Sequence, residues 1–282
     1  MIDCRNLVKS FGDNDVIRGI SLKLADGKIT SLVGKNGAGK STLIGLIVAY
    51  YQLNSGSVKK GTISIMPDAD NMYPSWTGIE FLTFISKLKK VDISEAIGLA
   101  KELGIEKNLK KKITSFSFGM KKKLSFIQCA IGQYETYIFD EPTSGVDVPS
   151  ALIMLDIIKR LKSNGSAVLL TSHNIDELER VSDYIYIIEN GKIIQEGTVS
   201  DIVNKKKELI YILVSSQINL IANLDLVRNY LHSIHEDSIE LLFSNESQAS
   251  ETVRELVLTY PIREFYQKKN SLIASVYNAH SD

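Results

Sequence analysis

Cysteine is scarce in this chain of 282 residues, with Cys4 and Cys129 as its only two examples. Two isolated cysteines make neither a disulfide framework nor a C-x-x-C metal site, so we expect reduced thiols in a cytoplasmic setting. The residues from Met1 to Asn6 are polar and charged, and we expect no secretory signal there. No window reaches the ~18–20 uninterrupted apolar residues that a membrane-spanning helix needs. Transport across a membrane would therefore require a pore on another chain.

An excess of either charge is also missing. Lys plus Arg number 33 and Asp plus Glu number 33, which gives a formal net charge of zero. This balance disfavours a strongly basic nucleic-acid binder, so we expect no nucleic-acid partner. Hydrophobic residues make up 44% of the chain and charged residues 23%, the composition of a globular protein that buries a core.

Strand and helix patterns alternate through the first two thirds of the chain. Short, continuously apolar runs at 137–139 and 167–170 are typical of central strands that are buried on both faces of a sheet. Strands alternating with helices favour an α/β core. We expect strands at residues 7–11, 20–24, 29–33, 137–139 and 167–170, and helices at 40–51, 152–161 and through much of 77–131.

The composition changes near residues 203–207, where three lysines follow one another. Beyond this point the pattern of strands and helices starts again. We therefore predict a main domain over residues 1–200, a linker over 201–207 and a small α+β domain over 208–282. In the small domain we expect strands at 208–214, 238–243 and 262–267, helices at 218–232 and 246–259, and a last short helix.

A glycine-rich segment at residues 34–42 fits the phosphate-binding pattern G-x-x-x-x-G-K-[ST] between a predicted strand and a predicted helix. Glycines let backbone N–H groups turn toward phosphate oxygens, and the helix N-terminus adds a partial positive charge. We expect Lys40 to reach the β- and γ-phosphates of a nucleotide and the Ser41 hydroxyl to ligate Mg²⁺. The predicted nucleotide-binding residues of this segment are Gly34, Lys35, Asn36, Gly37, Ala38, Gly39, Lys40, Ser41 and Thr42.

Two acids, Asp140 and Glu141, follow the apolar run at 137–139. At the carboxyl edge of a parallel sheet, Asp140 would lie beside the glycine-rich segment and hold Mg²⁺ through water. Glu141 would then act as the general base that polarises the attacking water. An acid after a strand is often only a turn residue. The residues that follow therefore have to show whether this pair has a catalytic role or only ends the strand.

The run Asp-Glu-Pro-Thr-Ser-Gly-Val-Asp at 140–147 resembles the Walker B motif and D-loop of ATP-binding-cassette nucleotide-binding domains. Residues 116–120, Phe-Ser-Phe-Gly-Met, are similar to the signature of that family, which is usually Leu-Ser-Gly-Gly-Gln. Residues 171–173, Thr-Ser-His, end a predicted strand as the switch histidine of the family does. The order of these motifs matches across about residues 1–200. The chain has no Asn-Lys-x-Asp motif, which weighs against a GTPase.

This resemblance implies a P-loop ATPase core with an antiparallel β subdomain and a helical signature subdomain, and ATP with Mg²⁺ as cofactors. ATP would lie between two cassettes joined head to tail. Ser117, Gly119 and Met120 would contact the nucleotide held by the partner cassette. His173 would bind the γ-phosphate and help to fix the water that Glu141 activates. Phe11 would stack on adenine, with core packing as its alternative role.

Three positions depart from the family. Asp68 follows Pro67, where the family carries a glutamine, and a carboxylate is a good Mg²⁺ ligand. We therefore expect Asp68 to join Ser41 and Asp140 as a metal-binding residue. In the signature, Phe118 replaces a glycine and Met120 replaces the glutamine.

We predict an ATP-hydrolysing subunit of a membrane transporter, peripheral on the cytoplasmic face of the membrane, whose pore lies on separate transmembrane permease subunits. Similarity to bacterial exporters favours export over import. One alternative is a soluble family member that acts on nucleic acid or ribosomes, although such proteins usually carry a coiled-coil insertion or two cassettes. Another is an ATP-gated regulatory subunit with weak hydrolysis, which Asp68 and Phe118 favour but Glu141 and His173 oppose.

Overall fold

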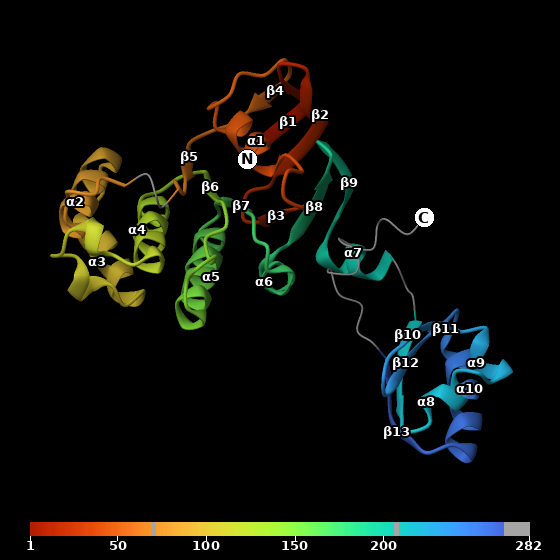
Figure 1. Ribbon diagram of the computed structural model, residues 1–282. Coiled ribbons are helices and arrows are strands. Elements are labelled where there is room, and N and C mark those ends of the chain that lie inside the picture. Colours follow the sequence, from red (N-terminus) through yellow and green to blue (C-terminus); the bar gives the residue numbers. More distant parts are fainter. Residues whose placement is uncertain (69–71, 206–208, 268–282) are drawn as a thin grey trace. The chain divides into compact units, whose positions relative to one another are not determined.

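The chain divides into two compact units, Met1–Ile202 and Val203–Asp282 (Figure 1). The computed structural model describes residues 1–68, 72–205 and 209–267. Helix α7 (Val199–Lys205) contains residues 201–205, which were expected to belong to the linker. The rest of that expected linker, 206–207, lies outside the described residues.

A six-stranded sheet forms the centre of the first unit, in the order β5-β6-β7-β3-β8-β9. Neighbouring strands are parallel except for the antiparallel pair of β8 and β9. The carboxyl ends of β3, β6 and β7 therefore meet at one edge, which is where open α/β sheets bind their ligands. The strands are β3 (Ile29–Val33), β5 (Ile63–Ile65), β6 (Thr136–Phe139), β7 (Ala167–Leu170), β8 (Tyr184–Glu189) and β9 (Lys192–Gly197).

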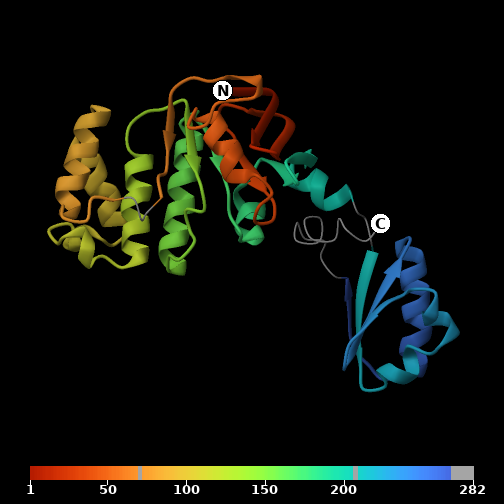
Figure 2. The same cartoon turned by 45° about the horizontal axis from the view of Figure 1, so that its top comes forward.

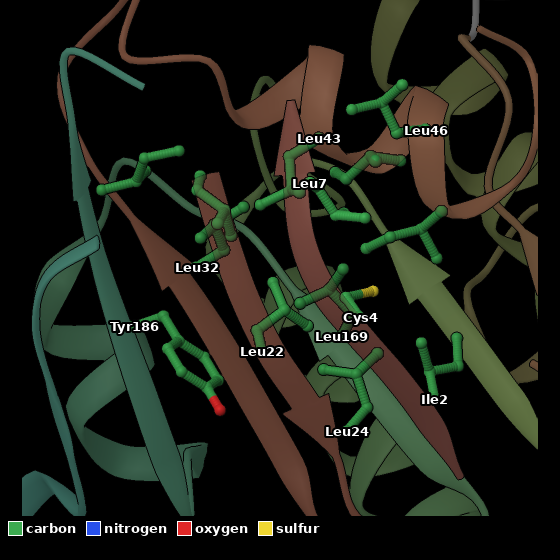
Figure 3. Close-up of a cluster of buried hydrophobic side chains, with 14 of the residues drawn as sticks. Ile2, Cys4, Leu7, Leu22, Leu24, Leu32, Leu43, Leu46, Leu169 and Tyr186 are labelled. Atoms are coloured by element: carbon green, nitrogen blue, oxygen red, sulfur yellow. The ribbon is translucent and has the colours of Figure 1, made fainter. Parts of the chain in front are cut away.

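A second, antiparallel sheet packs against the first, in the order β2-β1-β4. Its strands are β1 (Ile2–Phe11), β2 (Asn14–Leu24) and β4 (Ser55–Lys59). Figure 3 shows the apolar core that joins this sheet to the main sheet and to helix α1 (Lys40–Ile47). Leu7 and Leu22 come from the antiparallel sheet, Leu32 and Leu169 from the main sheet, and Leu43 from α1. Burial of each such side chain stabilises the fold by ~1.5–3 kcal/mol.

Three helices, α2 (Gly78–Lys89), α3 (Ile93–Glu102) and α4 (Phe118–Ala130), form a helical subdomain at one end of the first unit (Figures 1 and 2). The Lys89 ammonium at the end of α2 donates to the carbonyl oxygens of Cys129 and Ile131, which close the carboxyl end of α4. Helix α4 also lies beside α5 (Val148–Ser163) in both views. The predicted fold class, an α/β core with an antiparallel and a helical subdomain, is confirmed. Two short 3-10 helices, η2 (Glu106–Asn108) and η3 (Ile113–Ser115), and α6 (Ile175–Val181) complete this unit.

The second unit is a small α+β domain whose four antiparallel strands have the order β11-β12-β10-β13. With the two short helices between β10 and β11 taken as one segment, the chain order is the β-α-β-β-α-β of a ferredoxin-like fold. The strands are β10 (Leu209–Ser215), β11 (Leu231–Ile234), β12 (Ser238–Phe243) and β13 (Ile262–Gln267), and the helices are α8 (Ile218–Ile221), α9 (Asp225–Arg228) and α10 (Glu246–Thr259).

One helix predicted for this domain is wrong. The segment 218–232 splits into α8 and α9, because Leu224 between them is extended, with ψ 136°. The end of the segment enters β11 and pairs with β12 instead of continuing a helix. The last short helix that we expected lies in residues 268–282, outside the described residues.

Helix lengths in the first unit also differ from those predicted. Helix α1 ends at Ile47 because Ala49 adopts a left-handed conformation, with φ 65°, and the Tyr51 ring then covers Gly45. Helix α5 begins at Val148, earlier than expected, because the Asp147 side chain caps it. Across the described residues, every helix is too short or too polar to span a bilayer.

Candidate nucleotide-binding site

The glycine-rich loop connects β3 to α1 and depends on glycine for its shape. Gly39 precedes α1 in a left-handed conformation with φ 109°, and a Cβ there would come within 2.9 Å of Ile17 Cδ1. A Cβ on Gly34 would overlap the carbonyl oxygen of Ile188. Side chains at these two positions would therefore push the loop away from the sheet. Gly37 also has a positive φ, of 80°, and faces open space.

Lys40, the first residue of α1, folds back over this loop. Its ammonium donates to the carbonyl oxygens of Gly34 at 2.6 Å and Lys35 at 3.2 Å. Burial lowers the pKa of Lys40, while the nearby carboxylates of Glu141 and Asp140 oppose that shift. The ammonium is thus held at the mouth of the loop, between its carbonyls and two acids. Its contact with phosphates stays a prediction.

A pocket of about 310 Å³ brings the predicted motifs together. The glycine-rich loop forms one wall, and the ends of β6 and β7 form the other. Val16 of β2 adds an apolar side chain that the sequence analysis did not identify. The lining residues are Val16, Asn36, Gly37, Gly39, Lys40, Ser41, Thr42, Asp140, Glu141 and His173. Among the other predicted residues, Gly34, Lys35 and Ala38 belong to the same loop.

Thr171 joins the two acids at the sheet edge. Its hydroxyl donates a short hydrogen bond to Oδ1 of Asp140 and accepts one from the backbone N–H of Glu141 at 2.9 Å. Thr171 is fully buried, because it follows β7 directly. The sequence offers one indication of this role, because Thr171 is a polar residue directly after the apolar run at 167–170.

Glu141 has an unusual backbone and an unusual carboxylate. Its φ of 49° is rare for a residue other than glycine, and such strain is concentrated at functional sites. One carboxylate oxygen, Oε2, accepts from the backbone N–H of His173 at 3.1 Å. The other, Oε1, is buried 3.3 Å from Nε2 of His173 but has no hydrogen-bond partner among the described residues. Burial raises the pKa of Glu141, which His173 partly offsets.

The loops that follow β6 and β7 are tied together by Glu177 of α6. Its Oε2 accepts from the Thr143 hydroxyl at 2.7 Å and from the Ser172 hydroxyl at 3.3 Å. These bonds fix the loop that carries Glu141 against the loop that carries His173. No sequence motif marks Glu177, because its role depends on reaching from one loop to another.

Phe11 lies at the end of β1, with 43% of its surface exposed. The Tyr51 ring meets it edge-on, with 5.3 Å between the centroids, and the Lys9 ammonium lies 4.8 Å from the ring. Phe11 does not line the 310 Å³ pocket. Its stacking on adenine stays a prediction.

The signature residues begin α4 and lie outside the lining of this pocket. Ser117 is exposed and caps the helix, its hydroxyl accepting from the backbone N–H of Met120 at 3.3 Å. Gly119 approaches the loop after β6 so closely that a Cβ would lie 3.2 Å from the Gly145 carbonyl oxygen. None of Ser117, Gly119 and Met120 lines the 310 Å³ pocket of their own chain.

Asp68 also lies apart from the pocket lining. It is exposed and follows Pro67, whose carbonyl oxygen accepts a hydrogen bond from Ser125 of α4. The next residues, 69–71, lie outside the described residues. The predicted role of Asp68 in metal binding is therefore not supported by its position here and stays a prediction.

Comparisons with known proteins identify the family of this chain. The model of the ABC transporter family matches residues 17–144. The linearmycin resistance ATP-binding protein LnrL of Bacillus subtilis is 33% identical over 222 residues, which cover 73% of this chain and 71% of that protein. The Nod factor export ATP-binding protein I of Burkholderia lata is 29% identical over 213 residues, 70% of each chain.

A solved structure of an ATP-binding subunit of an ABC transporter has the same fold as this chain. Its TM-score is 0.69 at 24% identity, over 73% of this chain and 92% of that one. The family model covers the glycine-rich loop and the acid pair. The chain therefore belongs to the ABC transporter family, as an ATP-binding and ATP-hydrolysing cassette.

Proposed function

We propose that Glu141 is the general base for ATP hydrolysis in the 310 Å³ pocket. The observation that carries this proposal is its buried Oε1, which lies 3.3 Å from Nε2 of His173 but accepts no hydrogen bond from the described residues. A buried acceptor without a partner costs free energy, so it favours a ligand that brings a proton. The raised pKa of Glu141 also makes its carboxylate a better proton acceptor.

The residues around Glu141 supply the rest of the reaction. The backbone of the glycine-rich loop and the Lys40 ammonium would hold the phosphates. A water oxygen would form a bond to the γ-phosphorus as the bond between that phosphorus and the β–γ bridging oxygen breaks. The proton of this water would pass to Oε1 of Glu141, and His173 would donate to the γ-phosphate. The products are ADP and inorganic phosphate.

The pocket also fits Mg²⁺. The Ser41 hydroxyl and the Asp140 carboxylate both line it, and both are the oxygen ligands that Mg²⁺ prefers. Sites with one or two such ligands, completed by phosphate oxygens, are common for this ion. When bound, Mg²⁺ would neutralise charge on the β- and γ-phosphates. Asp68 would join this set only after the loop that follows β5 has moved, because it does not line the pocket.

Substitution Glu141→Gln tests the assignment of the base. We expect turnover to fall by roughly 10²–10⁴, the usual contribution of a general base, while ATP still binds. The measurement is phosphate release by the purified chain, with nucleotide binding followed by calorimetry. Asp156→Asn, which neutralises an exposed carboxylate of α5, is the control and should retain the parental rate. A Glu141→Gln variant that hydrolyses ATP as fast as the parent would remove Glu141 from the mechanism.

We further propose that a second cassette completes the site, most simply as a two-fold dimer of this chain. Ser117 supports this arrangement, because it is exposed and does not line the pocket of its own chain. So does a depression of about 480 Å³ that borders Glu141 and His173. Val148 and Leu152, which line it, are 73% and 52% exposed, and a second cassette would cover them. ATP would close the dimer, and hydrolysis would reopen it.

A separate permease is the second partner that we propose. A groove of about 510 Å³ runs along α2, with both apolar and polar side chains in its lining. It contains Trp76 and Phe84, whose ring centroids are 5.4 Å apart. Tyr73 stacks on Trp76 with a centroid distance of 4.6 Å and is half exposed. Clustered exposed aromatic rings are typical of the centre of a protein interface. A cytoplasmic segment of the permease would fill this groove and hold the chain on the cytoplasmic face of the membrane.

The relatives support export as the direction of transport, because one takes part in Nod factor export and another in linearmycin resistance. Co-expression of the tagged chain with its permease tests the docking groove. We expect an integral membrane chain to co-purify with the parent and to be lost with Phe84→Ala. The control, Leu88→Ala, removes another exposed apolar side chain of α2 outside the groove. Equal recovery with both variants would contradict the groove assignment.

A further inference from the structure

The first turn of α4 packs on the loop 142–147 of the same chain, and the contact depends on the signature residue Phe118. A Cβ built on Gly145 would lie 2.5 Å and 2.7 Å from two carbons of the Phe118 ring. The ring therefore occupies the space that any side chain at position 145 would need. Gly145 also has a positive φ of 73°, which favours glycine independently.

A second contact joins the same two elements one turn further along α4. The Lys123 ammonium lies 3.0 Å from Oδ2 of Asp147, and the Lys123 side chain is only 12% exposed. The other oxygen of Asp147 accepts from the backbone N–H of Ser150 at 3.0 Å and caps α5. Hydrogen bonds from Ser150 and Lys123 hold the pKa of Asp147 well below its usual range. The far end of the loop is thus fixed by a charged pair.

The near end of this loop is Glu141 itself. The backbone N–H of Ser144 donates to the carbonyl oxygen of Glu141 at 3.4 Å, and Thr143 is held by Glu177. Only Pro142, Thr143 and Ser144 separate Glu141 from Gly145. A shift of α4 would therefore reach the left-handed Glu141 through a short segment that is pinned at both ends.

We propose that Phe118 and Lys123 are positioning residues that set the placement of Glu141 in their own chain. This inference rests on the proposed dimer, in which Ser117 at the same helix end contacts the nucleotide of the partner. Engagement of Ser117 would hold α4, and α4 would hold the loop 142–147 with its general base. Occupancy of the partner's nucleotide site is thereby linked to hydrolysis in this chain's own site.

The variant Phe118→Ala tests the link. We expect kcat for ATP hydrolysis to fall by roughly 10–10²-fold, as when a catalytic group is slightly misplaced. The Kd of the pocket for ATP should stay unchanged, because Phe118 does not line the pocket. Phe118→Tyr, which keeps the ring, should restore the parental kcat, and Lys123→Met should lower it. Leu88→Ala, another exposed apolar side chain, is the control.

Gly145→Ala gives an independent test, because its new methyl group would collide with the Phe118 ring. We expect it to lower kcat alone, and to lower kcat by a smaller factor in a Phe118→Ala chain, where the ring is gone and only the strain of the positive φ remains. Such non-additivity is the mark of two residues in contact.

The inference is overturned by a Phe118→Ala chain with the parental kcat. It is also overturned if Phe118→Tyr fails to restore kcat, or if the effects of Phe118→Ala and Gly145→Ala simply multiply. Thermal unfolding of each variant identifies a general loss of folding, which would count against a positioning role. The proposed function is tested separately, since turnover by the parent and its loss in Glu141→Gln do not depend on Phe118.

Discussion

Substitution of Lys40 by methionine is the sharpest perturbation of the nucleotide pocket. The side chain keeps its length and apolar stem but loses the ammonium that lies between the loop carbonyls and the acid pair. In the proposed complex this ammonium donates to oxygens of the β- and γ-phosphates. Hydrogen bonds that involve charged groups contribute ~1.5–3 kcal/mol each. Loss of two such bonds would cost ~3–6 kcal/mol of binding free energy.

This free energy corresponds to a loss of roughly 10²–10⁴-fold in ATP affinity, since each tenfold change in Kd is about 1.4 kcal/mol. Folding should change much less. The bonds from Lys40 to the Gly34 and Lys35 carbonyls disappear in the variant, but so does the cost of burying an ammonium, which lowers the pKa of Lys40. Lys40→Met should therefore unfold near the temperature of the parent while binding ATP far more weakly.

The assay is calorimetric titration with Mg-ATP in a Glu141→Gln background, where hydrolysis does not consume the ligand. Lys192→Met, an exposed lysine of β9, serves as the matched control and should bind as the parent does. A Lys40→Met chain with unchanged affinity and an unchanged melting temperature would refute the assignment of this loop to the phosphates.

Three further predictions concern individual groups. Burial raises the pKa of Glu141 above its ordinary 4.5, so its carboxylate gains a proton at a higher pH than an exposed glutamate does. The acid limb of kcat for ATP hydrolysis should therefore lie above pH 4.5, and a limb below it would contradict the role of Glu141. Burial raises the pKa of both Cys4 and Cys129 to about 12, so a thiol reagent should label neither until denaturant exposes both. Gly39→Ala should destabilise the fold by ~1–3 kcal/mol and weaken ATP binding, because the φ of 109° at Gly39 and the closeness of Ile17 exclude a side chain. An unchanged midpoint of unfolding would argue against this.

Much of the site could be predicted because its residues follow local rules. The apolar runs at 137–139 and 167–170 became β6 and β7, and both are buried along their whole length. Strand β7 pairs in parallel with both β3 and β6. The ends of these strands therefore bring Asp140, Glu141 and His173 to one edge of the sheet. The glycine pattern at 34–42 could be recognised from its spacing alone, although the contacts that exclude side chains at Gly34 and Gly39 are with Ile188 and Ile17, which are distant in the sequence.

The contacts that orient those residues could not be predicted in the same way. Thr171, Glu177 and Lys123 act on partners that are 24 to 34 residues away in the chain. Such pairs depend on strand register and on how helices pack, which no motif records. In the second unit, the end of the predicted helix 218–232 forms β11 and pairs with β12. Tertiary contacts of this kind often override local preference.

Complementation between two inactive variants tests the central claim, that two cassettes share each ATP. Ser117→Arg places a bulky cation at the helix end that would touch the partner's nucleotide, and Glu141→Gln removes the base. Each variant alone should release almost no phosphate. In a mixture, the Glu141 of one chain would face the intact Ser117 of the other, which gives one complete site per mixed dimer. We expect a partial recovery of hydrolysis, because the chain that supplies this Glu141 carries Ser117→Arg, and its α4 therefore does not help to position the base. A mixture as inactive as its parts, or a Ser117→Arg chain with the parental rate, would contradict the account.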